Sequence, residues 1–392
     1  MNTTPIIVVG GGLGGLSCAL ALGRQGHAVR LLEQSDEIAP IGYGVQIGPN
    51  VLPVLDRLGV GDAIRQAAYL PDYLQLRDAH DGEPIFRIDL KGMGLRERFA
   101  APYIAIHRVD FHEVLLDACR ALPNVDLNQA TQVTGFSQTA DGVTVHSRGK
   151  PDLAGSALVA ADGLRSVLRS QLHPEDSSVP IGYAANRTIV RAADAPPVLR
   201  QERGVTMWTG ENFHVIYYPL RDATEINIVG VFQLPPELAP DDVDGYLAHV
   251  HAITAKAHPA VHEVISVLNL QRRWSIADRQ PTRKWSEGCM TLLGDAAHAT
   301  LQSLAQGAGM AIEDSAVLAQ EMAAHPGDPA RAFQAFERRR YLRTARVVLE
   351  SRALWPRYHC AGLEAEVRNA QWREMRDADF YRCLNWLWQP AV

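Results

Sequence analysis

Three glycines near the start of the chain have the spacing of a turn that holds the pyrophosphate of a dinucleotide. Gly10, Gly12 and Gly15 follow a short apolar run and precede a segment of small residues, 16–25, that is typical of a helix. The next apolar run ends at Glu33, a position from which an acid hydrogen-bonds the adenosine ribose. Together these features predict a dinucleotide-binding βαβ unit.

A second acid at a strand end lies almost the whole chain away. Asp295 follows the apolar run 290–293 and Gly294, and small residues then lead to Gly307, where a helix is expected to begin. Asp295 could be no more than a helix cap. However, small residues before a helix N-terminus let a flat ring approach and stabilise negative charge on it. One extended cofactor held from both ends of the sequence points to FAD.

A third motif lies between these two. Asp162 and Gly163 end a buried apolar run and lead into a predicted helix that carries Arg169. In one reading the motif is purely structural: Asp162 caps the helix, Gly163 makes a turn, and Arg169 lies on the surface. In the other reading, the motif belongs to the cofactor site.

The strand and helix patterns predict a discontinuous cofactor domain with an inserted sheet. Alternating segments flank Asp81-Gly82 and Asp141-Gly142, as expected for β-hairpins. Further strands are predicted at 187–192, 205–210, 213–220, 225–233 and 288–293, and helices at 311–324 and 330–351. The expected domains are a cofactor domain at 1–72, 101–175 and 275–350, a substrate domain at 73–100 and 176–274, and a helical tail at 351–392.

Composition excludes several classes of protein. The chain has 392 residues, is 47% hydrophobic and carries a net charge of -6, so nucleic acid is not an expected partner. We expect the basic cluster 338–340 to form a solvated helix face. No apolar run reaches the ~20 residues needed to span a bilayer.

The cysteines and histidines do not suggest a metal or disulfide framework. The five cysteines are scattered without close pairs, which predicts neither a zinc site nor disulfides and fits a reducing cytoplasm. His249 and His251 have the spacing of a pair on one strand face, but no further ligands accompany them, and a surface turn accounts for them. No metal site is expected.

Taken together, in this order and at these distances, the three motifs resemble those of the single-component flavin-dependent aromatic hydroxylases, the family of the p-hydroxybenzoate and salicylate hydroxylases. The likeness covers nearly the whole chain. It implies an α/β fold, in which a Rossmann-like FAD-binding domain of the p-hydroxybenzoate hydroxylase type carries an inserted antiparallel β-sheet domain and a C-terminal helical tail. It also implies NADH or NADPH as a transient co-substrate, O2 as oxidant and oxygen insertion through a C4a-hydroperoxyflavin.

The resemblance assigns the FAD contacts residue by residue. Asp162 and Gly163 would serve both FAD and the nicotinamide cofactor. One departure is Ala299, which stands where the family usually has proline, so the loop beside the flavin is expected to be less rigid. The residues expected to bind FAD are Gly10, Gly12, Leu13, Gly15, Glu33, Gln46, Arg108, Asp162, Asp295, Gly307 and Ala308.

The strand 213–220 carries the main clue to the substrate. Side chains alternate along a strand, so His214, Ile216 and Tyr218 share one face. This face could simply pack in the core. In the family, however, this sheet covers the substrate pocket, and a neutral histidine can take the proton of a phenol and so activate the ring.

Several segments most resemble the branch of the family that hydroxylates 3-hydroxybenzoate to 2,5-dihydroxybenzoate. By that likeness His214 and Gln302 bind and deprotonate the phenol, and Tyr218 holds the carboxylate. Asn186-Arg187 departs from the aromatic-Arg pair expected there. Hydroxylation of 6-hydroxynicotinate is the nearest alternative, although a histidine would be expected at Ser303, and salicylate is another. A flavin-dependent reductase or oxidase and a non-catalytic binding protein also stay open, and a homodimer is allowed.

Overall fold

The computed structural model describes residues 4–38, 42–139 and 142–391. Its first layer is a six-stranded sheet in the order β18-β19-β12-β1-β2-β8. All neighbours in it are parallel except the pair β18–β19. The strands are β1 Ile6–Val9, β2 Val29–Leu32, β8 Val125–Asn128, β12 Ala157–Ala160, β18 Ser286–Glu287 and β19 Met290–Leu292. The predicted strand at 288–293 is thus confirmed as β19.

The glycine turn connects β1 to the helix α1, Leu13–Arg24, which begins earlier than the sequence pattern suggests. The helix can start there because Gly15, inside its first turn, has no side chain: a Cβ at Gly15 would lie 1.8 Å from the carbonyl oxygen of Gly10. Helix α1 packs between α5, Arg108–Arg120, and α11, Gly307–Ala324. The start and the end of the chain's cofactor motifs therefore meet in one layer.

The second layer is a seven-stranded sheet in the order β17-β13-β16-β15-β14-β5-β6. Both hairpins expected around positions 81–82 and 141–142 form, although Asp141 itself lies outside the described residues. One pair in the sheet, β14–β5, is parallel because its strands come from distant parts of the chain. The strands are β5 Tyr73–Asp78, β6 Pro84–Asp89, β13 Val179–Arg191, β14 Val205–Gly210, β15 Phe213–Leu220, β16 Glu225–Gln233 and β17 Trp274–Asp278.

Two smaller sheets and the shorter helices complete these layers. The sheets are β3 Gly44–Ile47, β7 Ile104–His107 and β4 Ala68–Tyr69, and β9 Val133–Thr139, β10 Gly142–Ser147 and β11 Lys150–Gly155. The helices are α2 Leu52–Arg57, α3 Gly61–Ala67, α4 Met93–Phe99, α6 Val167–Leu172, α7 Pro197–Arg200, α8 Val243–Thr254, α9 Pro259–Ser266 and α10 Asp295–His298, with 3-10 turns η1 Ala192–Asp194 and η2 Gln302–Leu304.

The two faces of β15 point into different environments, as its alternation predicts. Phe213, Val215 and Tyr217 pack in a core with α8 and α9. His214 and Tyr218 point to the opposite face, where helix α12 crosses the sheet. The seven-stranded sheet is therefore covered by α8 and α9 on one side and by the C-terminal helices on the other.

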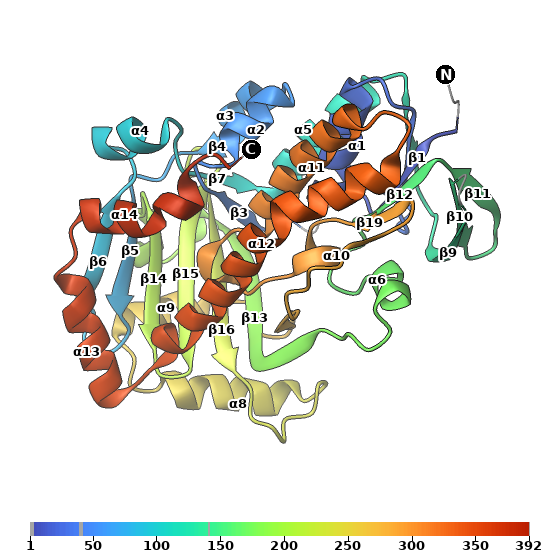
Figure 1. The fold of residues 1–392 in the computed structure, drawn as a ribbon. Helices are drawn as coiled ribbons and strands as arrows, with labels where there is room; N and C mark the ends of the chain where they lie inside the picture. The colour runs from blue at the N-terminus through green and yellow to red at the C-terminus, as the bar shows by residue number, and fades with distance from the viewer. Residues whose placement is uncertain (1–3, 39–41, 140–141, 392) are drawn as a thin grey trace.

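Helix α12, Pro329–His359, is longer than the predicted helix at 330–351. Figure 1 shows it running from beside α11 across the seven-stranded sheet, followed by α13, Gly362–Arg373, and α14, Asp377–Trp388. Buried residues recur at helical spacing through Ser351, Trp355 and His359, which explains why the helix continues past residue 351. Its last turn consequently reaches the strand that carries His214.

Candidate functional site

A cavity of about 830 Å³ lies where the two layers and the C-terminal helices meet. It is lined both by the glycine turn and by the face of β15 that carries His214. Of the predicted site residues, those lining it are Gly12, Leu13, Gln46, Arg108, His214, Tyr218, Asp295, Gln302, Gly307 and Ala308. The structure thus brings together residues spread over almost 300 positions, while Gly10, Gly15, Glu33 and Asp162 do not line this cavity.

The three glycines of the turn do different things. A Cβ at Gly10, where φ is +109°, would lie 2.3 Å from the carbonyl oxygen of Ala161, so this position must be glycine. Gly15 permits the helix to pack on the turn. A Cβ at Gly12, in contrast, would meet nothing within 4 Å. Gly12 therefore leaves open room beside the N-terminus of α1, as a bound phosphate group requires.

Glu33 stabilises the glycine turn through hydrogen bonds to its backbone. Its Oε2 accepts a hydrogen bond of 2.6 Å from the N–H of Gly11, and its Oε1 accepts one of 2.9 Å from the N–H of Ser35. The carboxylate at the end of β2 thus fixes the shape of the loop. Its predicted contact with a ribose stays a prediction.

The motif of Asp162, Gly163 and Arg169 makes more contacts with the rest of the protein than its purely structural reading predicts. The Asp162 carboxylate does cap α6, accepting from the N–H of Val167 at 3.0 Å, and burial raises its pKa. The surface position considered for Arg169 is wrong. Arg169 is buried and donates to the carbonyl oxygens of Ala296 and Ala297 at 2.9 and 2.6 Å. It therefore ties this motif to α10, directly after Asp295.

Asp295 and the start of α11 form the other side of the cavity. Asp295 is exposed within an otherwise buried segment, and the residue before it, Gly294, has φ of +62°. Helix α11 begins at Gly307 without a side-chain cap from Gln306. Its first N–H groups thus face the cavity beside Asp295, where they favour a negatively charged group.

The loop between these elements lacks the expected proline yet keeps its geometry. Ala299 is buried, with φ of -49° and ψ of 133°. This φ is close to the value that a proline ring imposes. The surrounding residues therefore hold the conformation that proline would fix covalently.

Two half-buried arginines that line the cavity, Arg108 and Arg187, have no acidic partner among the described residues. Neither Arg108 nor Arg187 takes part in an ion pair within the described part of the chain. Burial lowers the pKa of both guanidinium groups, and for Arg108 the charge of Asp295 partly opposes this effect. Two desolvated cations that form no ion pair in the described part of the chain make the cavity suited to anionic groups.

Arg187 lines the cavity, although the sequence reasoning assigned it no role. It lies on β13, and its Nη2 is 3.4 Å from Oε1 of Gln302. The sequence shows only an unexpected residue before it, Asn186, whose side chain points away and donates to the carbonyl of Arg272 at 2.9 Å. One signal was available. Arg187 lies within a strand pattern, and the residue that faces it on the neighbouring strand is Val229, which is not an acid.

The predicted substrate residues lie around the same end of the cavity. His214 is 3% exposed, and its Nδ1 is 2.8 Å from Nε2 of His359. Burial, and then the neighbouring His359, lower the pKa of His214 well below 6.5. Burial raises the pKa of Tyr218 to about 12, so its hydroxyl is a hydrogen-bond donor at neutral pH. The polar groups are therefore a neutral histidine, a phenol, an amide and a guanidinium.

Gln46, predicted to contact the cofactor, lies on the floor of the cavity. Its Oε1 accepts a hydrogen bond of 2.7 Å from the hydroxyl of Tyr103. This contact fixes the orientation of the amide, and a side-chain hydrogen bond with Gln46 partly opposes the rise in the pKa of Tyr218.

A buried ionic network supports the segment from Gly294 to His298. Arg340 was expected on a solvated face, which is wrong: it is 1% exposed and pairs with Asp314 at 2.7 Å. Helical spacing places Arg340 on the same side as Phe336, toward α11. Asp314 also accepts from His298 at 2.5 Å and from the N–H of Gly294 at 3.2 Å. Burial opposes ionisation of Asp314, but His298 and Arg340 hold its pKa at about 2.

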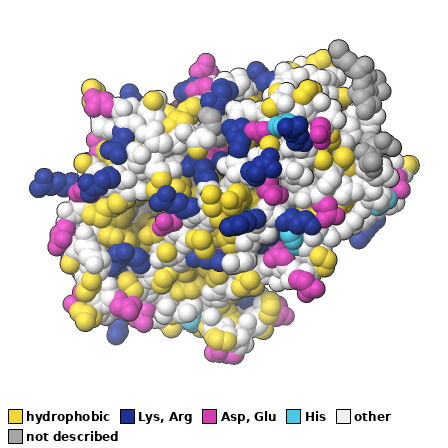
Figure 2. All heavy atoms as spheres, in the orientation of Figure 1, with side chains coloured by type: hydrophobic (Ala, Val, Ile, Leu, Met, Phe, Trp, Pro, Cys, Tyr) yellow, Lys and Arg dark blue, Asp and Glu magenta, His cyan; other side chains and the backbone are white. Residues whose placement is uncertain are grey.

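The C-terminal helices close the cavity. Arg343 donates to the carbonyl oxygens of Trp386 and Leu387 at 2.7 and 2.9 Å. Trp388 is 3% exposed and packs against Phe99. The C-terminal tail is therefore docked onto the rest of the protein, and it also supplies part of the cavity wall. Figure 2 shows hydrophobic side chains gathered on this face, with Lys and Arg side chains among them.

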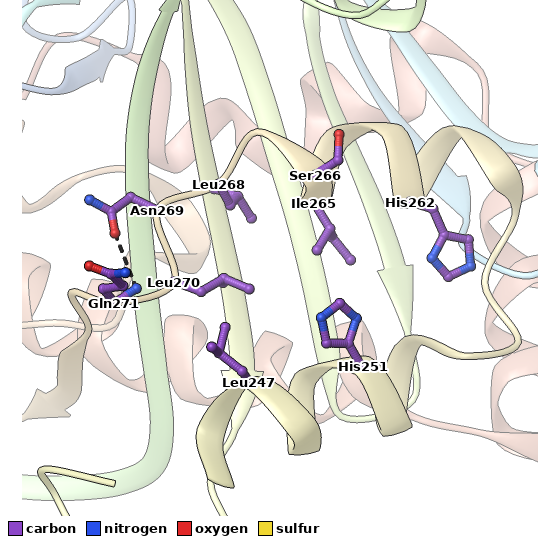
Figure 3. Close-up of a pocket in the computed structure, with 9 residues that line it drawn as sticks. All are labelled: Leu247, His251, His262, Ile265, Ser266, Leu268, Asn269, Leu270 and Gln271. Carbon is purple, nitrogen blue, oxygen red and sulfur yellow. Dashed lines mark hydrogen bonds between the residues drawn. The ribbon is translucent and has the colours of Figure 1, made fainter. Parts of the chain in front are cut away.

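A second, more open hollow of about 650 Å³ lies between α8 and α9. Figure 3 shows His251 and His262 on its two sides. His249 and His251 belong to helix α8, so the surface turn expected for them is wrong, and His249 bonds to the carbonyl oxygen of Gln233. Over the described ranges no group of three or more His, Cys, Asp or Glu side chains could hold a metal ion, and no helix is long and apolar enough to cross a membrane.

Comparison with known proteins matches nearly the whole chain. A family model described as FAD binding domain matches residues 3–351. A 3-hydroxybenzoate 6-hydroxylase from Klebsiella oxytoca is 40% identical over 382 residues, covering 97% of this chain and 96% of that protein. A 6-hydroxynicotinate 3-monooxygenase from Bordetella bronchiseptica is 32% identical over 345 residues, covering 87% of this chain and 89% of that protein.

Solved structures match at the level of the fold. The crystal structure of Klebsiella pneumoniae HpxO complexed with FAD and uric acid has a TM-score of 0.87 and 28% sequence identity, covering 99% of this chain and 98% of that one. A salicylate hydroxylase substrate complex has a TM-score of 0.77 at 24% identity, covering 98% of this chain and 95% of that one.

Proposed function

Since this chain belongs to the FAD binding domain family and is an FAD-dependent monooxygenase, we propose that it hydroxylates 3-hydroxybenzoate at C6. The family, the fold and the FAD cofactor predicted from the sequence are confirmed. The proposed reaction converts 3-hydroxybenzoate, NAD(P)H, H⁺ and O2 into 2,5-dihydroxybenzoate, NAD(P)⁺ and water. Relatives at 35–40% identity that carry the name of this hydroxylase support the choice of substrate.

The observation that carries the proposal is the polarity of one end of the cavity. Arg187 has no acidic partner in the described chain, and the neutral side chains of His214 and Gln302 line the same space. An aromatic acid that also bears a hydroxyl group satisfies all three. We place its carboxylate against Arg187 and Tyr218, and its hydroxyl against His214 and Gln302.

The residues that line the other end of the cavity fit FAD. The open side of Gly12 and the guanidinium of Arg108 suit its phosphates, and Asp295 suits its ribityl hydroxyls. The uncapped start of α11 suits a ring that becomes negatively charged on reduction. When bound, FAD takes electrons from NAD(P)H and activates O2 for attack on the ring.

His214 has the properties of a base for the substrate phenol. Electrophilic attack is faster on a phenolate than on a phenol, and a neutral imidazole can accept the proton. Because burial keeps His214 uncharged, it is ready to accept at neutral pH. The O–H bond of the substrate breaks, the electron pair stays on the oxygen, and the proton moves to a ring nitrogen of His214.

The test of this function is a coupling measurement with a panel of aromatic acids. Wild-type holoprotein is expected to couple NAD(P)H oxidation to hydroxylation most tightly with 3-hydroxybenzoate. His214→Ala should keep FAD but oxidise NAD(P)H with little hydroxylation. Tighter coupling with 6-hydroxynicotinate or salicylate would mean that one of these is the substrate. Wild-type coupling in His214→Ala would mean that His214 only packs in the core.

We propose a cytoplasmic location and a homodimer, each on its own observation. Five free cysteines support a reducing compartment, which we take to be the cytoplasm. Leu342 and Leu349, on one exposed side of α12, support association of two copies into a homodimer. Light scattering of the holoprotein would measure its mass, and a single-chain mass would rule out the dimer.

A further inference from the structure

The proton on His359 has a fixed position. The Nδ1 atom of His359 lies 2.8 Å from the carbonyl oxygen of Trp355, one helical turn earlier in α12. A carbonyl oxygen only accepts hydrogen bonds, so Nδ1 must carry the hydrogen. In a neutral imidazole the other nitrogen, Nε2, is then an acceptor.

That assignment determines the proton on His214. Nε2 of His359 lies 2.8 Å from Nδ1 of His214, and because Nε2 accepts, Nδ1 of His214 must donate. The remaining nitrogen of His214, Nε2, therefore carries no hydrogen. Since His214 lines the cavity, this unprotonated nitrogen is the one left for a molecule inside it.

The environment keeps His359 neutral, which the chain of hydrogen bonds requires. Burial lowers the pKa of His359 to about 4, the carbonyl of Trp355 partly opposes this, and the charge of Arg368 adds to it. The other titratable groups that face the two rings are Tyr183 on β13 and Tyr358 on α12. No carboxylate is hydrogen-bonded to either ring within the ranges that the structure describes.

The position of His359 is itself well fixed. Its carbonyl oxygen accepts a hydrogen bond of 3.2 Å from Asn212, in the turn between β14 and β15. The hydroxyl of Thr209 on β14 donates to the carbonyl of the preceding residue, Tyr358. The last turn of α12 is therefore bound to the same hairpin that carries His214.

We propose that His359 is a positioning residue that sets the tautomer of His214, so that Nε2 of His214 meets the substrate hydroxyl as an unprotonated acceptor. This inference rests on the proposed function, in which His214 takes the phenol proton. When the substrate O–H bond breaks, Nε2 of His214 gains the proton and the electron pair stays on the phenolate oxygen. Nδ1 of His214 continues to donate to His359, so the hydrogen on Nδ1 stays in place while Nε2 gains the proton.

Two variants of His359 separate this role from simple packing. His359→Phe keeps a ring in the space beside Tyr183 and Trp355 but offers no acceptor to His214. His359→Gln can place its amide oxygen where Nε2 lies, and so keeps the acceptor. His262→Phe, at an exposed position on α9 beside the open hollow in Figure 3, is the matched control.

The first readout is the ionisation of bound 3-hydroxybenzoate in oxidised holoprotein, followed by ultraviolet difference spectra across pH. We expect phenolate to form at higher pH in His359→Phe than in wild type, and the rate of coupled hydroxylation to fall by about 10-fold to 100-fold. His359→Gln and His262→Phe should resemble wild type. If His359→Phe ionises the ligand as wild type does, the inference is wrong.

The second readout is independent of substrate. In ¹⁵N-histidine-labelled holoprotein, two-bond ¹H–¹⁵N correlation spectra report which ring nitrogen carries the hydrogen, with variants at 214 and 359 used for assignment. We expect the hydrogen on Nδ1 in both residues, and a hydrogen on Nε2 of His214 would overturn the proposal. If wild type neither binds nor hydroxylates 3-hydroxybenzoate, the proposed function fails, whereas the tautomers still decide the role of His359.

Discussion

The guanidinium of Arg187 lies 3.4 Å from the amide oxygen of Gln302. This contact joins the middle of β13 to the 3-10 turn that follows Asp295, so the substrate sheet and the cofactor loop meet at one point. Because the contact is long for a hydrogen bond and Arg187 has no acidic partner in the described chain, a carboxylate can replace it at little cost. Gln302 is then free to meet a hydroxyl group.

The first prediction concerns that carboxylate site. Arg187→Leu should raise the Kd for 3-hydroxybenzoate by about 10-fold to 100-fold, since a hydrogen bond to a charged group contributes roughly 1.5–3 kcal/mol. Flavin fluorescence titration of the holoprotein measures it. The matched ligand is 3-hydroxybenzyl alcohol, which lacks the carboxylate and should bind both proteins alike. An equal loss for both ligands would mean that Arg187 only supports the fold.

The second prediction concerns Asp295, the first residue of α10. Asp295→Ala should be purified largely without FAD, because it removes the carboxylate that faces the cavity beside the start of α11. The ratio of flavin to protein absorbance measures the loss. Asp242→Ala, which removes the cap of α8 far from the cavity, should stay fully yellow. A fully flavinylated, active Asp295→Ala protein would contradict the assignment.

The third prediction concerns stability and pH. The pKa of His359 is lowered from 6.5 to about 4 by burial, so the folded state favours the neutral ring. The unfolded chain then binds a proton first, and the free energy of unfolding falls as pH drops from about 6.5 toward 4. At about 1.4 kcal/mol per pKa unit the loss reaches roughly 3 kcal/mol.

Urea denaturation of wild type and His359→Phe at several pH values checks this, because the buried histidines that do not contact His359 contribute equally to both proteins. As pH falls, the free energy of unfolding should decrease less in the variant than in wild type. Parallel pH curves for the two proteins would show that His359 titrates normally.

The fourth prediction concerns the loop that lacks its proline. Because Ala299 already has φ of -49°, Ala299→Pro should raise the free energy of unfolding by about 0.4–1 kcal/mol through the unfolded state. Ala297→Pro is the control: its N–H donates to the carbonyl of Gly294 at 2.8 Å, and losing that bond should cost ~3 kcal/mol. A destabilised Ala299→Pro would show that the loop is held differently.

Local patterns made much of the fold predictable. The strand β1, its glycine turn and α1 adjoin in sequence, so spacing alone defines them. The alternation along β15 likewise placed His214 and Tyr218 on one face, and the structure puts both on the cavity wall. These features depend on neighbours within a few residues, which a single sequence displays directly.

The remaining features depend on contacts between distant segments. Arg340 resembles a surface residue until α11 supplies Glu313 and Asp314 beside it. His359 contacts His214 only because α12 continues past Pro356 to reach β15. The sequence pattern placed Arg340 on a solvated face and ended the helix before His359, because it could not show which distant segments face these two residues.

The most direct test of the central claim uses the wild-type holoprotein with NADH, 3-hydroxybenzoate and ¹⁸O2. Mass spectrometry of the products follows both the position and the source of the new oxygen atom. We predict 2,5-dihydroxybenzoate that contains one ¹⁸O atom, formed in step with NADH oxidation. Oxidation of NADH that yields hydrogen peroxide and no ¹⁸O-labelled aromatic product would contradict the account.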